Sequence, residues 1–176
     1  MNKIQFSVFV LLVIIAYLIL DTYDQKSMND DIALKHAIEK AKLITVRADG
    51  KGSGLSSFTD ETNDAESFIL VTFWASWCIP CLKEADALNE LDESLQNKIK
   101  IWGVASMDEI NQVKKSEFIR KTSFDIYFDQ NDQLADFYNV NNLPQSFLFD
   151  QTGRFYQHFK QAIESHDVEI LNKLLH

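Results

Sequence analysis

Only two side chains in this 176-residue chain are cysteines, and they lie three positions apart, at Cys78 and Cys81. A protein held together by disulfides uses more cysteines, spread along the chain so that the bridges close long loops. A bridge between Cys78 and Cys81 would close only a short loop and would remove little entropy from the unfolded chain. The pair is therefore better suited to redox chemistry, cycling between a dithiol and a disulfide, than to stabilising the fold.

The cysteines lie where a predicted strand is followed by a predicted helix. Residues Phe68–Trp74 form a continuous apolar run of strand length, typical of a strand that is buried on both faces. Between Pro80 and Leu95 apolar residues recur every three or four positions, which predicts an amphipathic helix. The free N–H groups and the partial positive charge at the start of a helix stabilise a thiolate, the form of cysteine that attacks disulfides.

The location of the cysteines at the start of this predicted helix suggests a different role for each of them. Cys78 is nearer the loop and the positive end of the helix, so we expect it to be the nucleophile. Cys81 lies one turn into the helix and would resolve the mixed disulfide. Pro80 suits the first turn because its missing N–H loses no hydrogen bond there. The chemistry requires no cofactor other than the Cys78–Cys81 disulfide itself.

The remaining pattern predicts an α/β fold with a mixed central sheet. A second buried strand at Ile99–Ala105 follows the first helix, which implies a right-handed crossover and parallel pairing. A second helix is predicted over Ile110–Lys121, and two late strands joined by a tight turn ending at Gly153 predict an antiparallel hairpin. The order is βαβ followed by ββα, with the later elements at Ile126–Phe128, Gln133–Tyr138, Ser146–Phe149 and Arg154–Phe159, and a final helix with Val168, Leu171, Leu174 and Leu175 on one face.

An uncharged apolar segment, Ile4–Leu20, begins the chain. As a helix it would span roughly 25 Å, the short end for a bilayer core, and Lys3 before it favours an N-terminus on the inside. We expect an uncleaved anchor at residues 1–20, a tether and helix at 21–44 with the helix over Ile32–Ile44, and one domain at 45–176. A cleaved signal peptide and a buried soluble helix remain alternatives, although the segment does not end in the small residues of a cleavage site.

Two segments together resemble a known family. FWASWCIPC at 73–81, with Glu84 after it, and LPQSFLFD at 143–150 are similar to the TlpA/ResA/CcmG (DsbE) group of membrane-tethered thioredoxin-like proteins. The resemblance implies a thioredoxin fold and an enzyme that exchanges thiols and disulfides, commonly as a reductant of apocytochrome c or other extracytoplasmic proteins. It also implies a membrane protein that donates or accepts electrons, and a single-pass location in a bacterial inner membrane with the domain in the periplasm. By resemblance, Leu143 and a cis Pro144 face the cysteines and bind the substrate backbone.

Two positions depart from the pattern of thioredoxins or of this group, and a third matches it. Thr72 occupies the place of the buried acid of ordinary thioredoxins, so proton transfer must use another group. In this group a carboxylate after the second strand can take part, and the match falls on Asp108, with Glu109 next to it. An acid near the sulfurs would raise their pKa values and assist proton transfer, whereas Asp108 could equally begin the second helix as its N-cap. Asp86 replaces a family proline, which predicts a less kinked first helix.

Several neighbouring side chains have simpler interpretations. We expect Trp77 to lie over the site at the surface, Phe73 and Trp74 to lie in the core, and Glu84 to face solvent. The histidines are scattered, with no metal-ligand partner by spacing; they are His36, His158, His166 and His176.

Other functional classes fit the sequence less well. A copper-binding assembly protein on the same fold would place three residues between its cysteines and add a histidine near the hairpin, where only His158 lies. A thiol peroxidase would need a single attacking cysteine in a threonine-containing loop with a supporting arginine, and neither is evident around Cys78. A closed zinc site needs four ligands, of which the pair supplies two. A net charge of −9 without a cluster of basic residues argues against a nucleic-acid partner.

Overall fold

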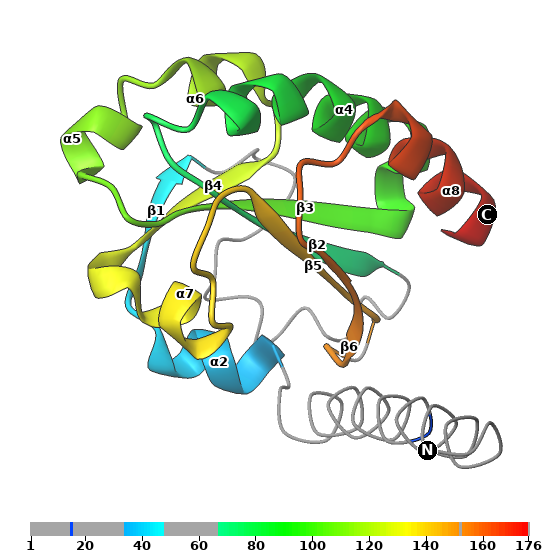
Figure 1. Ribbon diagram of the computed structural model, residues 1–176, viewed down its shortest axis with the longest axis horizontal. Helices are drawn as coiled ribbons and strands as arrows, with labels where there is room; N and C mark the ends of the chain where they lie inside the picture. The colour runs from blue at the N-terminus through cyan, green and yellow to red at the C-terminus, as the bar shows by residue number, and fades with distance from the viewer. Residues whose placement is uncertain (1–14, 16–33, 48–66, 152, 176) are drawn as a thin grey trace, which may run out of the picture.

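A mixed β-sheet with helices on both faces forms the part of the chain that the computed structural model describes, namely residues 15, 34–47, 67–151 and 153–175 (Figure 1). The strand order across this sheet is β1-β4-β3-β2-β5-β6. The strands are β1 (Leu43–Arg47), β2 (Phe68–Trp74), β3 (Ile99–Ala105), β4 (Asp125–Asp129), β5 (Gln145–Phe149) and β6 (Phe155–Phe159). The helices are α2 (Leu34–Lys40), α4 (Ile79–Leu95), α5 (Ile110–Val113), α6 (Glu117–Lys121), α7 (Gln133–Phe137) and α8 (Ser165–Leu175), with 3-10 turns at Gln96–Lys98 and Gln130–Asp132.

Strand β2 lies inside the sheet, between β3 and β5. It pairs in parallel with β3 and antiparallel with β5, and β3 in turn pairs in parallel with β4. Strands β1 and β6 form the two edges, each antiparallel to its neighbour. The continuous apolar run of β2 is buried from Ile69 to Trp74, as its sequence predicts. The predicted α/β fold with a mixed sheet is confirmed.

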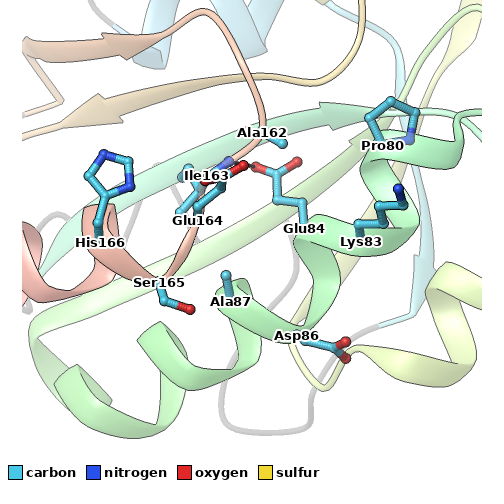
Figure 2. Close-up of a pocket in the computed structure, with 10 residues that line it drawn as sticks. All are labelled: Pro80, Lys83, Glu84, Asp86, Ala87, Ala162, Ile163, Glu164, Ser165 and His166. Atoms are coloured by element: carbon cyan, nitrogen blue, oxygen red, sulfur yellow. Dashed lines mark hydrogen bonds between the residues drawn. The ribbon is translucent and has the colours of Figure 1, made fainter.

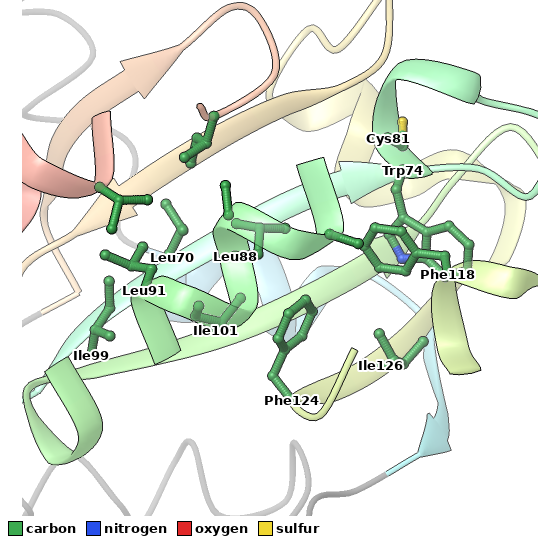
Figure 3. Close-up of a cluster of buried hydrophobic side chains, with 14 of the residues drawn as sticks. Leu70, Trp74, Cys81, Leu88, Leu91, Ile99, Ile101, Phe118, Phe124 and Ile126 are labelled. Carbon is green, nitrogen blue, oxygen red and sulfur yellow. The ribbon is translucent and has the colours of Figure 1, made fainter. Parts of the chain in front are cut away.

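The sheet separates two hydrophobic cores. Alternate residues of β2 point to opposite faces, so Leu70 and Trp74 pack under α4, α6 and α8, whereas Val71 and Phe73 pack toward α2 and α7. Figure 3 shows the first core, where the ring of Trp74 stacks on that of Phe118 with centroids 4.1 Å apart. Phe73 and Trp74 are both fully buried, which confirms their predicted place in the core.

Two predicted helices differ from those observed. The helix expected over Ile110–Lys121 is two short helices, because Ser116 adopts an extended conformation and its side chain caps α6 by accepting the N–H of Ile119. The break lets Val113 and Phe118 both enter the core, although five residues apart they would not share one face of a continuous helix. The helix expected over Ile32–Ile44 ends at Lys40, and the chain continues as strand β1.

The N-terminal predictions fall mainly outside the described residues. Apart from Ile15, residues 1–20 are not among them, so the anchor stays a prediction. None of the helices within 34–47, 67–151 and 153–175 has the length and apolar character needed to cross a membrane. The boundary at residue 45 also stays a prediction; α2, which precedes it, buries Leu34, Ala37 and Ile38 in the second core.

Candidate active site

Four chain segments meet at one edge of the sheet. Strands β2, β3 and β4 are parallel, so their carboxyl ends and the loops that follow them lie together. Strand β5 runs in the opposite direction and therefore begins at this same edge, where Gln145 pairs with Phe73. The strand directions thus bring the residues after Trp74, Ala105 and Asp129 close to those before Gln145.

Cys78 and Cys81 form a disulfide at the start of helix α4, with their Cα atoms 5.3 Å apart. Cys78 is the N-cap of the helix, and its sulfur accepts the N–H of Cys81 at 3.2 Å. The first-turn proline, Pro80, lies at N1/N2 as predicted. Cys78 exposes 3% of its surface and Cys81 none, so a partner reaches the disulfide at Cys78. The position of Cys78 just before the helix predicts a more exposed residue than the structure shows.

Two apolar side chains flank the disulfide at the surface. Trp77 is 62% exposed and Ile79 is 66% exposed, although both are large and apolar. The indole N–H of Trp77 donates to the carbonyl of Met107, at 3.0 Å, so the ring is tied to the loop after β3. We call Trp77 and Ile79 the apolar rim; they are the exposed apolar side chains next to Cys78 in the sequence.

The predicted cis bond between Leu143 and Pro144 is confirmed. Leu143 is half-buried and Pro144 is buried, immediately before strand β5. The strand pairing places this segment beside the end of β2, from which the cysteine loop departs. The structure therefore brings Leu143 and Pro144 to the same edge as the cysteines, where the resemblance expects them.

Asp108 supports the cysteine loop from the side of β3. Its Oδ2 accepts the N–H of Ser76 at 2.5 Å and its Oδ1 accepts the N–H of Glu109 at 2.7 Å. The N-cap of α5 is Glu109, without a side-chain bond to the helix, so the alternative that Asp108 caps this helix is wrong. Asp108 instead fixes the backbone two residues before Cys78. Its part in proton transfer, and that of Glu109, stay predictions.

Glu84 is buried, not facing solvent as its charge suggested. It exposes 2% of its surface and lies on the face of α4 that also carries Cys81, Ala85 and Leu88. Its Oε1 accepts the N–H of Ile163 at 3.2 Å and the hydroxyl of Ser146 at 3.4 Å. The spacing of three from Cys81 and four to Leu88 was a signal in the sequence that Glu84 shares the inward face.

Burial changes the acidity of Glu84. Loss of solvation raises the pKa of its carboxyl to about 8; the hydrogen bonds from Ile163 and Ser146 offset part of this rise, and the negative charge of Asp167 adds to it. The other oxygen, Oε2, has no hydrogen-bond partner among the described residues. At neutral pH the carboxyl is therefore largely protonated and able to exchange a proton.

Glu84 also lines a surface pocket of ≈ 540 Å³ between α4 and the segment that leads into α8 (Figure 2). The pocket extends to Pro80, at the first turn of the disulfide-bearing helix. Its lining residues are Pro80, Lys83, Glu84, Asp86, Ala87, Ala162, Ile163, Glu164, Ser165 and His166. The carboxyl thus lies between the helix that carries the disulfide and a cavity open to the surface.

In this protein the buried acid is Glu84 on helix α4, whereas in ordinary thioredoxins the buried acid lies on a strand. Thr72, the strand position of the acid in ordinary thioredoxins, is fully buried, and its hydroxyl oxygen has no partner in the described part of the chain. Thr72 pairs in register with Ser146, whose hydroxyl donates to Glu84. Three polar side chains from β2, β5 and α4 therefore share the space below the disulfide, and Glu84 is the one that can ionise.

His158, the histidine that a copper site would need, has other partners. Its Nε2 is 2.8 Å from Oε1 of Gln145, and its ring stacks on Phe147 with centroids 4.1 Å apart. Burial lowers the pKa of its imidazole, with a smaller effect from the positive charge of Lys160. Gln145 in turn donates to Asn142, so His158 belongs to the packing that follows Pro144.

Residues 37–158 match the AhpC/TSA family. The thiol-disulfide oxidoreductase ResA of Bacillus cereus is 26% identical over 164 residues, which cover 90% of this chain and 88% of that protein. ResA of Geobacillus kaustophilus is 30% identical over 102 residues, 57% of this chain and 59% of that protein.

Solved structures share the fold. The thioredoxin domain of a thiol-disulfide oxidoreductase from Bacteroides vulgatus superposes with a TM-score of 0.60 at 20% identity, covering 77% of this chain and 95% of that one. A DsbE-type thiol:disulfide interchange protein from Chlorobium tepidum superposes with a TM-score of 0.55 at 24% identity, covering 64% and 79%.

These relatives confirm three predictions: the thioredoxin-like fold, the resemblance to the ResA and DsbE proteins, and the activity class of a thiol–disulfide oxidoreductase. The match to the family spans more than half of the chain and includes both cysteines, the loop after β3 and the cis-proline segment. The chain therefore belongs to the AhpC/TSA family.

Proposed function

We propose that this protein reduces disulfides of extracytoplasmic proteins from an anchor in a bacterial inner membrane. The observation that carries the proposal is the Cys78–Cys81 disulfide at the start of α4, with Cys78 the less buried of the two cysteines and the apolar rim beside it. The cysteines of apocytochrome c are one substrate class that the family resemblance supports. A membrane protein that carries a dithiol would return the two electrons.

The reaction follows from the order of the two sulfurs. The Cys78 thiolate attacks one sulfur of the substrate disulfide, forms a mixed disulfide and releases the other substrate sulfur as a thiolate. Cys81 then loses its proton and attacks the sulfur of Cys78, which releases the second substrate sulfur. Both substrate thiolates take up protons, and the protein is left with the Cys78–Cys81 disulfide. Two electrons have moved from the protein to the substrate.

Glu84 is suited to exchange a proton with Cys81, accepting it in the minority of molecules in which the carboxyl is ionised at neutral pH. The two residues lie one helical turn apart, which places their Cβ atoms about 5–6 Å from each other. A carboxyl with a pKa of about 8 is close in acidity to a cysteine thiol, so a proton can pass between them at little cost in free energy. The burial of Cys81 leaves no solvent route from its sulfur, which makes a nearby internal base useful.

The reduction potential of the Cys78–Cys81 couple tests the direction of transfer. We expect a value near that of thioredoxin, about −270 mV, because a protein that reduces others must hold its electrons weakly. Equilibration with dithiothreitol and glutathione buffers of known potential, read by thiol alkylation, measures it. A value near −120 mV would make the protein an oxidant and reverse the proposed direction.

Trapping of the mixed disulfide tests the roles of the sulfurs. The Cys81→Ser variant is expected to accumulate covalent complexes through Cys78, since nothing remains to resolve them. Non-reducing electrophoresis of membranes that contain the variant, followed by reduction of the bands, identifies the partners. The matched control is the double variant Cys78→Ser/Cys81→Ser. Equal bands from both proteins, or no bands from a folded Cys81→Ser variant, would show that Cys78 is not the nucleophile.

A further inference from the structure

The loop after β3 holds the ring of Trp77 through the backbone of Met107. Its carbonyl accepts the indole N–H of Trp77 at 3.0 Å, and its own N–H donates to Oδ1 of Asp132 at 2.5 Å. Met107 has a positive φ of 58°, so its peptide groups are set in an unusual orientation. The two hydrogen bonds form a direct chain from Asp132 to the exposed ring beside Cys78.

The carboxylate of Asp132 is not used by its own helix. Asp132 is the N-cap of α7, where an aspartate usually accepts an N–H of the first turn, yet it makes no such bond. The buried Asp129 caps the helix instead, because its Oδ2 accepts the N–H groups of Leu134 and Ala135 at 2.9 Å each. With the helix already capped, Asp132 is directed across to Met107.

We infer that Asp132 is a positioning residue that holds Trp77 in place for protein partners, acting through the backbone of Met107. Trp77 is 62% exposed, so without this chain its ring is free to change rotamer at the surface. Ordering a side chain during association costs free energy, and a ring that is already fixed avoids that cost. The inference rests on the proposed function only for its effect on partners; the positioning itself is independent of it.

The substitutions must remove the acceptor without straining the turn. Asp132 has a φ of 54°, which glycine adopts freely, so Asp132→Gly removes the carboxylate without forcing a side chain into this conformation. Asp132→Asn keeps an acceptor oxygen and serves as the conservative variant. The matched control is Asn131→Gly, at the exposed neighbouring residue with a φ of 63°.

The first measurement follows the indole N–H of Trp77 by NMR, with its signal assigned by its loss in Trp77→Phe. Asp132→Gly is expected to speed hydrogen exchange of this N–H about fivefold, the effect of one lost hydrogen bond. Asp132→Asn and Asn131→Gly should stay within about twofold of the unchanged protein. Equal rates in Asp132→Gly and Asn131→Gly would overturn the inference.

The second measurement compares a protein disulfide with a small one. The reduced Asp132→Gly variant is expected to reduce insulin about fivefold more slowly but to reduce hydroxyethyl disulfide at an unchanged rate, since that molecule is too small to need the ring. Trp77→Phe should slow insulin reduction to the same extent as Asp132→Gly, and the double variant should show no further loss; additive losses would contradict an effect through Trp77. If the unchanged protein itself fails to reduce insulin, the proposed function fails, while the exchange result still decides the positioning.

Discussion

Between pH 5 and pH 8 the unchanged protein is expected to lose up to about 4 kcal/mol more of its free energy of unfolding than the oxidised Glu84→Gln variant. Folding raises the pKa of this carboxyl from 4.5 to about 8, so within that window the folded chain holds a proton that the unfolded chain has released. Stability therefore falls as the pH rises from the unfolded value toward the folded one and is level above it. Glutamine carries no titrating proton and removes the part of the dependence that Glu84 causes.

Urea denaturation of both proteins at a series of pH values measures this effect. Asp129, whose pKa burial also raises, contributes in the same direction to both curves, so the difference between them reports Glu84. Glu90→Gln is the control, because Glu90 is exposed on the same helix and its replacement should leave the pH dependence unchanged. Parallel curves for Glu84→Gln and the unchanged protein would show that Glu84 ionises normally in the fold.

Replacing Cys78 with serine is expected to lower the rate of disulfide exchange by at least about 10³-fold, to the uncatalysed level. A serine hydroxyl is not ionised at the start of α4, and Cys81 cannot substitute for the lost thiolate because it has no exposed surface. Insulin reduction under multiple turnovers measures the loss. Cys81→Ser should instead complete the first attack in a single turnover and then stop.

Folding of Cys78→Ser must be compared with the reduced form of the unchanged protein, since neither contains the bridge. Closing so short a loop contributes only about 2 kcal/mol, so both proteins should unfold at similar urea concentrations. If Cys78→Ser keeps a substantial part of the activity while Cys81→Ser loses all of it, the roles of the two sulfurs are reversed.

The strand, the disulfide and the helix were predictable because each depends on residues close in sequence. The buried run of β2, the cysteine spacing and the periodicity of α4 all lie within 68–95, and the structure agrees with them. The prediction for Glu84 is wrong because its charge favours the surface, whereas its spacing on α4 places it on the buried face. Burial of a carboxyl is rare, but here it is compensated by Ser146 and Ile163, which lie 62 and 79 residues further along the chain.

The support of the cysteine loop could not be predicted from local patterns. Met107 and Asp132 adopt left-handed backbone conformations that residues other than glycine seldom adopt; Met107 gives no sign of this in its residue type, and the aspartate type alone is too weak a signal to predict it. Their hydrogen bonds join segments 25 and 30 residues apart, which only the parallel order of β2, β3 and β4 brings together. The role of Asp108 is equally hard to predict, because only the packing of these strands determines whether its side chain caps α5 or accepts the N–H of Ser76.

The cysteine loop has different neighbours on the two sides of β2. Residues 106–109, which hold the loop, follow β3, whereas Leu143 and the cis Pro144 precede β5 on the opposite side. Strands β3 and β5 pair with opposite edges of β2 through separate rows of backbone hydrogen bonds. Residues 143 and 144 can therefore vary without breaking the hydrogen bonds that Met107 and Asp108 make to the cysteine loop.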